Sequence, residues 1–334
     1  HDLLAEGREA AVPVLPGSID PIESDDEAVE LAEEIGYPVI IKASAGGGGR
    51  GIRVAHNDVA LRAGMAQAKA EAEAAFGDGA IYMEKYLERP RHVEIQVLCD
   101  GKDNRIHLGE RDCTIQRRHQ KLLEESPSPV LDKHLRRAMG EAALNLCEAC
   151  AYANAGTVEF LVQDGEFYFM EMNTRIQVEH PVTEMVVRSR GRPMDLIEEQ
   201  IRVAQGEELR HRQKDIRFEG HAIECRINAE DPDRGFAPFP GTVELYVPPA
   251  HSGVRVDSFV YSGYRIPPHY DSMVAKLIAH GRDRAEAIER ARRALEDMLV
   301  EGVKTTIPFH RKLLEHVAFV NNQYDIHFID EQGI

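Results

Sequence analysis

Two acids and an amide that could bind a metal ion occur in one segment of the chain, TVEFLVQDGEFYFMEMNTRIQVEHP, residues 157–181. Glu159, Glu171 and Asn173 offer the hard oxygen ligands that Mg²⁺ prefers, and Mg²⁺ held by few protein groups normally takes nucleotide phosphates as its remaining ligands. Arg175 offers a planar fork for a small oxyanion, and Glu179 lies beyond it as a candidate base. The segment therefore predicts chemistry at a metal-bound phosphate.

A β-hairpin is the element that would bring these side chains together. Runs of β-branched and aromatic residues flank the dipeptide DG, which is typical of a hairpin turn. Side chains alternate between the two faces of a strand. A two-residue turn would therefore place Glu159 and Glu171 on opposite faces, whereas a three-residue QDG loop would place them on the same face. We predict the three-residue loop, and we expect the alternation to continue along one strand from Glu171 to Glu179. The alternative is a solvated face with mixed charges, but an apolar partner strand favours a cleft.

A run of glycines follows a short apolar strand that ends near Lys42. The run consists of Gly46, Gly47, Gly48 and Gly49. Backbone N–H groups at such a hairpin tip can bind phosphate oxygens, and the loop would suit a lid that closes over a nucleotide. The pattern is neither a Walker A loop nor a GxGxxG dinucleotide motif. A flexible linker is the alternative, but strands on both sides favour phosphate binding.

The segment QRRHQK, residues 116–121, carries three cations and an imidazole. We predict that it forms one strand and turns toward a triphosphate. A nucleic-acid patch is the alternative, but the segment lacks interleaved aromatic residues and the chain is acidic overall. His92, taken alone, is typical of a surface histidine.

Composition limits the classes of function. A chain of 334 residues with 40 basic and 57 acidic residues has a formal charge of −17, which argues against a nucleic acid or an anionic membrane as the principal partner. The sequence contains no apolar stretch of membrane-spanning length and no signal-peptide core, so we expect a cytoplasmic protein, or a mitochondrial matrix protein in a eukaryote. The cysteines are odd in number and scattered, and we interpret the CxxC of Cys147 and Cys150 as part of a helix.

The pattern of elements predicts an α+β chain. Ser24 and Glu27 form a capping box before a helix that Gly36 ends. Short strands at residues 39–43, 52–55 and 81–84 and a helix at 58–75 complete a small unit. A larger domain follows. We divide the chain into a linker at 1–12, a glycine-lid subdomain at 13–87, a catalytic subdomain at 88–205 and a C-terminal domain at 206–334.

In their order, several segments resemble the biotin carboxylases of the ATP-grasp superfamily. The resemblance runs from about Ala11 to the C-terminus and rests on IIKASAGGGGRG, MEKYLERPRHVEIQ, ERDCTIQRRHQK, GTVEF, EMNTRIQVEHPVTEM and CRINAEDP. It implies an ATP-grasp fold with a small glycine-lid subdomain and a larger antiparallel-sheet domain, followed by a biotin carboxylase C-terminal domain.

The resemblance also implies roles for individual residues. ATP-binding roles fall on Lys42, the four glycines, Glu84, Lys85, Leu87, His92, Gln116, His119, Lys121, Glu159 and Glu171. Metal-binding roles fall on Glu159, Glu171 and Asn173. Bicarbonate-binding roles fall on Arg175, Gln177 and Val178. The family assigns the base to Glu179 and the contact with the biotin enolate to Arg226.

The implied reaction uses ATP with Mg²⁺ or Mn²⁺. Glu179 would deprotonate bicarbonate, Arg175 would orient it, Lys121 would offset charge on the γ-phosphate, and the product would be carboxyphosphate. Its breakdown beside biotin would give CO₂ for carboxylation. The implied partners are a biotin carboxyl carrier protein and a carboxyltransferase. Two alternatives are another carboxyphosphate-forming ligase that acts on an amine or ammonia, which has no reason to carry CRINAEDP, and a catalytically silent binding module.

Two departures from the family pattern stand out. Family members normally begin with a nucleotide-fold-like domain that supplies another ATP lysine and helps to form a homodimer, so we expect this chain to be a fragment, a truncated gene product or a split subunit. The second departure is the basic loop RSRGRP, residues 188–193, where the family usually has a shorter turn.

Overall fold

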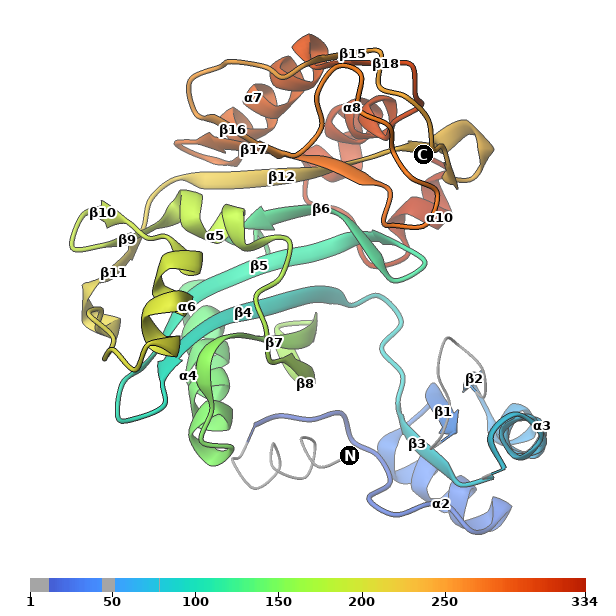
Figure 1. The fold of residues 1–334 in the computed structure, drawn as a ribbon. Helices are drawn as coiled ribbons and strands as arrows, with labels where there is room; N and C mark the ends of the chain where they lie inside the picture. Colours follow the sequence, from blue (N-terminus) through green and yellow to red (C-terminus); the bar gives the residue numbers. More distant parts are fainter. Residues whose placement is uncertain (1–11, 44–51, 78) are drawn as a thin grey trace. The chain divides into compact units, whose positions relative to one another are not determined.

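The structure, a computed structural model, describes residues 12–43, 52–77 and 79–334. It divides into two compact units, one formed by Pro13–Pro90 and the other mainly by Arg91–Ile334 (Figure 1). The division of the chain into four segments stays a prediction. The main sheet of the larger unit contains strands from both sides of residue 205.

The small unit is a three-stranded antiparallel sheet with two helices. Its strands are β1 (Val39–Ala43), β2 (Ile52–Ala55) and β3 (Ile81–Lys85), in the order β2-β1-β3, and its helices are α2 (Asp25–Ile35) and α3 (Asp58–Phe76). As predicted, α2 begins where the Ser24 hydroxyl accepts from the Glu27 N–H, and Gly36 ends it with φ 81°. Apolar side chains of both helices pack on Ile41 and Met83 of the sheet.

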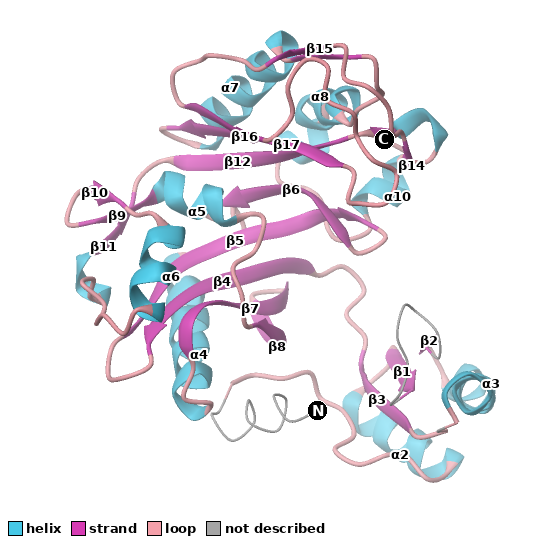
Figure 2. Cartoon of the chain, viewed as in Figure 1, coloured by secondary structure: helices cyan, strands magenta, loops and turns pink. Residues whose placement is uncertain are grey.

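The larger unit is built on an eight-stranded antiparallel sheet with the order β16-β17-β12-β6-β5-β4-β7-β8 (Figure 2). The strands are β4 (Arg91–Asp100), β5 (Arg105–Arg117), β6 (Gln120–Ser126), β7 (Ala153–Gln163), β8 (Glu166–Asn173), β12 (His221–Asn228), β16 (Val254–Ser258) and β17 (Met273–Gly281). This mixed architecture is the predicted α+β class.

Helices cover the sheet of the larger unit. They are α4 (Lys133–Ala149), α5 (His180–Val186), α6 (Leu196–Ala204), α7 (Arg284–Asp297), α8 (Ile307–Glu315), α9 (Val317–Val320) and α10 (Phe328–Gln332). Ala222 and Ile278 pack in a core with α5 and α6, whereas Ile223 and Leu277 pack in a second core with α7 and α8. The alternation along β12 and β17 therefore buries both faces of the sheet.

Short strands complete the unit. They are β9 (Val187–Ser189), β10 (Arg192–Pro193), β11 (Ile216–Phe218), β13 (Glu230–Asp231), β14 (Ala237–Pro238), β15 (Leu245–Val247) and β18 (Leu299–Glu301), with 3-10 turns at Gln213–Asp215 and Pro232–Arg234. The basic segment 188–193 lies in β9, β10 and the turn between them, which contains Arg190 and Gly191. It forms a hairpin that pairs with β11.

The turn between β7 and β8 differs from the prediction. Gln163 pairs with Glu166, so the turn contains only Asp164 and Gly165, with φ of 53° and 81°. The predicted three-residue loop is therefore wrong. Left-handed conformations at both positions match the right-handed twist of a hairpin, and Asp and Gly tolerate them.

A β-bulge restores the predicted relationship between the two acids. Phe160 pairs with Phe169, but Glu159 pairs with Glu171, so Met170 is an extra residue on β8. The extra residue compensates for the two-residue turn. Glu159 and Glu171 therefore lie on the same face, as predicted, but for a different reason.

The predicted bounds of two other strands are wrong. β8 ends at Asn173, and the chain then runs irregularly to Glu179, which is the N-cap of α5. The segment 116–121 is a hairpin tip instead of one strand, because Arg118 and His119 form the turn between β5 and β6 with φ of 50° and 63°.

The cysteines are all in described parts of the chain and form no disulfide with one another. Cys147 lies in α4 and Cys150 is its C-cap residue, so the CxxC belongs to a helix, as predicted. Within the described residues, we find no helix with both the length and the apolar character needed to cross a membrane.

Candidate active site

Four charged side chains form one row across neighbouring strands of the large sheet. Arg111 on β5 pairs with Glu94 on β4, and Glu94 pairs in turn with Glu159 on β7. Glu159 pairs with Glu171 on β8. Directly opposite residues of an antiparallel sheet point to the same face, so the strand register alone gathers three carboxylates beside one guanidinium.

Lys121 on β6 offsets the repulsion among Glu94, Glu159 and Glu179. Its Nζ lies 2.6 Å from Glu94 Oε2, 3.2 Å from Glu159 Oε1 and 2.6 Å from Glu179 Oε1. Burial alone would lower the pKa of Lys121, but the surrounding acids raise it above its usual value. The ammonium group therefore stays charged at the centre of the acids.

Arg111 lies at one end of this row and is fully buried. Its acceptors are the side chains of Glu94, Gln96, Thr157, Gln177 and Thr183. Burial would raise the pKa of Glu94, but Arg111 and Lys121 lower it to about 2. Glu94 is therefore a carboxylate at neutral pH, held between two cations.

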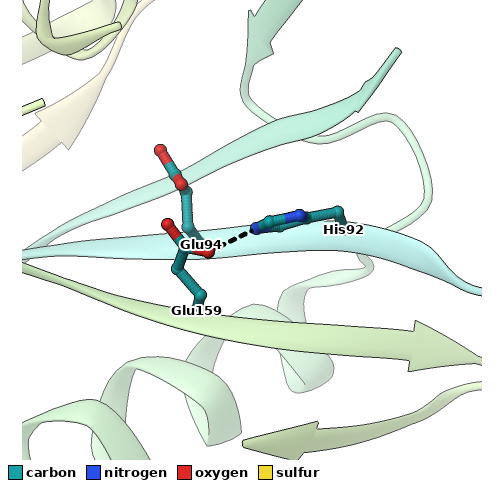
Figure 3. A group of neighbouring side chains, drawn as sticks. All are labelled: His92, Glu94 and Glu159. Carbon is teal, nitrogen blue, oxygen red and sulfur yellow. Dashed lines mark ion pairs between the residues drawn. The ribbon is translucent and has the colours of Figure 1, made fainter. Parts of the chain in front are cut away.

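His92, Glu94 and Glu159 lie side by side in Figure 3, with ligand atoms within 4.8 Å of one another. His92 Nε2 lies 2.9 Å from Glu159 Oε2, and Gln116 Nε2 lies 3.2 Å from the other ring nitrogen. Burial would raise the pKa of Glu159, but His92, Lys121 and Gln177 lower it below its usual range. His92 is buried, so the interpretation of it as a surface histidine is wrong.

The predicted metal ligands come together around Asn173. Its Nδ2 lies 3.0 Å from Glu159 Oε1 and 3.2 Å from Glu171 Oε1. A half turn of the amide would present Oδ1 between the same two carboxylates and complete a set of hard oxygen ligands. These residues fit Mg²⁺ or Mn²⁺.

Glu179 is held between two cations at the beginning of α5. It is 2 % exposed, and its Oε2 lies 2.8 Å from Arg226 Nη2 while Oε1 contacts Lys121. The backbone before it is also fixed, because Lys276 Nζ donates to the Val178 carbonyl at 2.8 Å. Gln177 donates to Glu159 Oε1 at 2.8 Å and so links this turn to the acids of the sheet.

Many of these groups line a cavity of about 690 Å³. Every predicted site residue of the larger unit lines it: His92, Gln116, His119, Lys121, Glu159, Glu171, Asn173, Arg175, Gln177, Val178, Glu179 and Arg226. Arg175 and His119 are exposed, and Arg175 Nη2 lies 3.3 Å from Asn173 Oδ1. The volume suits a small-molecule substrate or cofactor.

The other predicted site residues lie in the small unit. Lys42 on β1 forms an ion pair with Glu84 on β3. Lys85 Nζ donates at 2.9 Å to the carbonyls of Gly36 and Tyr37, and Leu87 is buried. The predicted phosphate loop of glycines at 46–49 lies outside the described residues.

The sequence prediction did not include Glu94, Arg111 and Glu124, which contact residues of the cavity or one another without lining the cavity themselves. Glu94 and Arg111 are cross-strand partners, and Glu124 Oε1 accepts a hydrogen bond from Arg226 Nε at 2.6 Å. A signal for Glu94 was present, because it alternates with His92 in the strand sequence RHVEIQ and therefore shares its face.

Two families match the chain. Residues 4–212 match the family described as carbamoyl-phosphate synthase L chain, ATP binding domain, and residues 224–331 match the biotin carboxylase C-terminal domain. Biotin carboxylase 1 of Bacillus subtilis is 58% identical over 329 residues, which are 98% of this chain and 72% of that protein. The chain belongs to the biotin carboxylase family.

Other relatives and solved structures agree with this family. The biotin carboxylase of Nostoc sp. is 54% identical over 327 residues, which are 98% of this chain and 72% of that protein. The biotin carboxylase domain dimer of Hydrogenobacter thermophilus 2-oxoglutarate carboxylase, in complex with MgADP, ADP and bicarbonate, has a TM-score of 0.86 at 47% identity. Campylobacter jejuni biotin carboxylase, in complex with beta-gamma-ATP, has a TM-score of 0.87 at 48% identity. Each structural match covers 98% of this chain and 72% of the other. The fold is therefore that of the biotin carboxylases of the ATP-grasp superfamily, which are ATP-dependent ligases.

Proposed function

We propose that this chain catalyses the ATP- and bicarbonate-dependent carboxylation of biotin through carboxyphosphate. The observation that carries the proposal is the position of Glu179, between Lys121 and Arg226 in the same cavity as the metal-binding acids. The proposed reaction forms one oxyanion and then a second one on biotin. Two cations beside the base can stabilise both. The Hydrogenobacter thermophilus domain with MgADP and bicarbonate supports both substrates.

Nucleotide-binding roles are assigned to residues that line the cavity of the larger unit, and the family pattern assigns further roles to residues of the small unit. Glu159, Glu171 and Asn173 would hold Mg²⁺ or Mn²⁺, which supplies charge neutralisation at the phosphates of ATP. His92, Gln116, His119 and Lys121 line the same cavity and would contact the nucleotide. From the small unit, Lys42, Glu84, Lys85, Leu87 and the glycines at 46–49 are assigned by the family pattern.

The bicarbonate step is assigned to the turn before α5. Arg175, Gln177 and the Val178 backbone would hold bicarbonate, and Glu179 would take its proton. The bicarbonate oxygen then attacks the γ-phosphorus of ATP, the bond to the β,γ-bridging oxygen breaks, and ADP leaves. Lys121 lies beside Glu179 and stabilises the negative charge of the transferring group.

The biotin step is assigned to Arg226. Carboxyphosphate decomposes to CO₂ and phosphate, phosphate takes the ureido proton of biotin, and the resulting nitrogen nucleophile captures CO₂. The guanidinium of Arg226 would stabilise the enolate oxygen of biotin while the proton is absent. Exclusion of water from the site would protect carboxyphosphate.

Partners and location follow from the family pattern. Biotin would arrive on a biotin carboxyl carrier protein, and a separate carboxyltransferase would determine the final acceptor. Assembly as a homodimer is consistent with the Hydrogenobacter thermophilus domain dimer. The cytoplasm, or the mitochondrial matrix in a eukaryote, stays the predicted compartment.

The test measures ADP release and carboxybiotin formation with MgATP and bicarbonate, with and without free biotin. We expect biotin to be carboxylated, and we expect Arg226→Ala to reduce carboxybiotin formation more than bicarbonate-dependent ADP release. ADP release that is unchanged by biotin, without carboxybiotin, would instead indicate a ligase with another acceptor. Nucleotide binding without turnover would indicate a silent binding module.

A further inference from the structure

Behind Arg226, two glutamates of neighbouring strands face each other in the protein interior. Glu124 on β6 is the direct cross-strand partner of Glu224 on β12, and each is 0% exposed. Side chains in such positions are about 5 Å apart at Cβ. Two negative charges at this distance in a poorly solvated interior repel each other strongly, so the pair is unstable with both groups ionised.

The hydrogen bonds of the two acids distinguish them. Glu124 Oε1 accepts from Arg226 Nε at 2.6 Å and lies 2.5 Å from Arg226 Nη2. Both oxygens of Glu224 are buried without a hydrogen-bond partner among the described residues. Burial of a carboxylate without a partner is far less favourable than burial of a neutral acid. The geometry therefore assigns the charge to Glu124 and a proton to Glu224.

The charged groups around the pair support this assignment. They are Arg226 of β12, Lys121 of β6, Lys276 of β17 and Glu179 at the beginning of α5, with the thiols of Cys113 on β5 and Cys225 on β12. Lys276 already donates to the Val178 carbonyl and lies 3.7 Å from Asp257 Oδ2. Burial raises the pKa of Glu224 well above its usual value, and the charge of Glu124 raises it further. Burial raises the pKa of Glu124 to about 7 although Arg226 opposes this.

We propose that Glu124 and Glu224 form a buried acid pair with one proton, in which ionised Glu124 is a positioning residue for the guanidinium of Arg226. The proposal rests on the proposed function and deepens it. Glu124 and Glu179 contact Arg226 from different elements and so fix the plane of its guanidinium. A fixed plane orients the donors toward an oxyanion in the cavity before the reaction begins. Neutral Glu224 adds no further charge that would compete for Arg226.

The first experiment tests the positioning role with Glu124→Gln, which keeps the size of the side chain and removes its charge. With MgATP, bicarbonate and free biotin at pH 8, we expect carboxybiotin formation to fall roughly 10- to 100-fold, and ADP release without biotin to change less than about threefold. In an Arg226→Gln background, Glu124→Gln should cause no further loss, because Glu124 acts through Arg226. Equal losses in both readouts, or independent losses in the double variant, would overturn the positioning role.

The second experiment tests the proton with Glu224→Gln, which copies the neutral acid. An acid with a raised pKa in the fold becomes progressively less favourable as pH rises above the pKa of the unfolded chain, about 4.3. We therefore expect the melting temperature of Glu224→Gln to exceed that of the wild type by roughly 2–4 °C or more at pH 8, and the excess to disappear at pH 4. Glu141→Gln, on the exposed surface of α4, is the control and should show no such excess.

Infrared spectroscopy would detect the protonated carboxyl group of Glu224 directly. At pH 8 the wild type should show the C=O stretch of a protonated carboxyl group, Glu224→Gln should lack it, and Glu141→Gln should keep it. Neither this band nor the melting temperature requires turnover, so both test the acid pair even if biotin is not the substrate. Absence of the band from the wild type, with no gain in melting temperature for Glu224→Gln, would overturn the acid pair and leave the proposed function standing.

Discussion

Glu159 and Glu171 lie directly opposite each other on β7 and β8, although the turn that joins the strands contains only two residues. The bulge at Met170 makes this possible, because one extra residue on β8 reverses the face of every residue that follows it. Glu171 therefore reaches the same side of the sheet as Glu94 and Lys121. The arrangement of the acids that we propose as metal ligands depends on this irregularity.

Removal of one of these acids should weaken metal-dependent nucleotide binding. Glu171→Gln keeps the hydrogen bond to Asn173 possible but removes one negative charge, so we expect the affinity for MgADP to fall by roughly tenfold, or about 1.4 kcal/mol. Calorimetry with MgADP and with ADP alone would measure the difference. Glu166→Gln at the exposed beginning of β8 is the matched control. An equal loss for ADP without metal would contradict a role for Glu171 in metal binding.

Substitution of Glu179 should separate catalysis from binding. Glu179→Gln removes the proposed base and keeps hydrogen bonding to Lys121 and Arg226 possible, so we expect bicarbonate-dependent turnover to fall by at least about 100-fold. The affinity for MgATP should change by less than about threefold, since the acids proposed to bind the metal stay in place. Steady-state kinetics and equilibrium binding would measure the two effects. A large loss of nucleotide affinity would assign Glu179 to the metal site instead.

The buried guanidinium of Arg111 should be required for folding stability. Arg111→Met leaves the carboxylate of Glu94, which is 0% exposed, with Lys121 as its remaining cation. Breaking a buried ion pair in this way costs about 3–5 kcal/mol of unfolding free energy. Urea unfolding followed by circular dichroism would measure it. Arg137→Met, which breaks an exposed ion pair on α4, should leave stability unchanged, and equal behaviour of the two variants would contradict the prediction.

The sequence predicted elements better than it predicted their connections. The hairpin of β7 and β8 follows from β-branched and aromatic runs around a DG turn, and α2 follows from the caps Ser24 and Gly36. The bulge at Met170 has no local signal, because it arises from the way β8 pairs along β7. For the same reason the prediction placed Glu159 and Glu171 correctly through the wrong loop.

The prediction of the site residues was limited in the same way. Residues of one continuous segment, from Glu159 to Glu179, could be associated because they are close in sequence. The pairing of Glu94 with Arg111 and of Glu124 with Glu224 depends on long-range strand register, which one sequence does not reveal. The burial of His92 also follows from the strands on both sides of β4.

A buried histidine beneath Arg226 should make the stability of the fold dependent on pH. His310 Nε2 lies 2.7 Å from the Arg226 carbonyl, and its buried Nδ1 has no hydrogen-bond partner in the described chain. Burial lowers the pKa of His310 to about 4, whereas a histidine in an unfolded chain titrates near 6.5. The fold therefore favours the neutral ring, and the unfolded chain binds the proton first as pH falls.

Because the pKa of His310 is lower in the fold than in the unfolded chain, His310 makes the fold less stable as pH falls. The contribution of His310 is fully present above about pH 6.5 and is lost progressively as pH falls toward 4, with a total of about 3 kcal/mol. His310→Gln can donate to the same carbonyl without titrating, so the stability difference between wild type and variant should shrink or reverse by about this amount between pH 7 and pH 4. Urea unfolding across this range would measure the difference, with His134→Gln on the exposed surface of α4 as the control. His107, whose pKa is also lowered by burial, is present in both proteins and cancels. A difference between wild type and His310→Gln that stays constant from pH 7 to pH 4 would show that His310 is not held neutral by the fold.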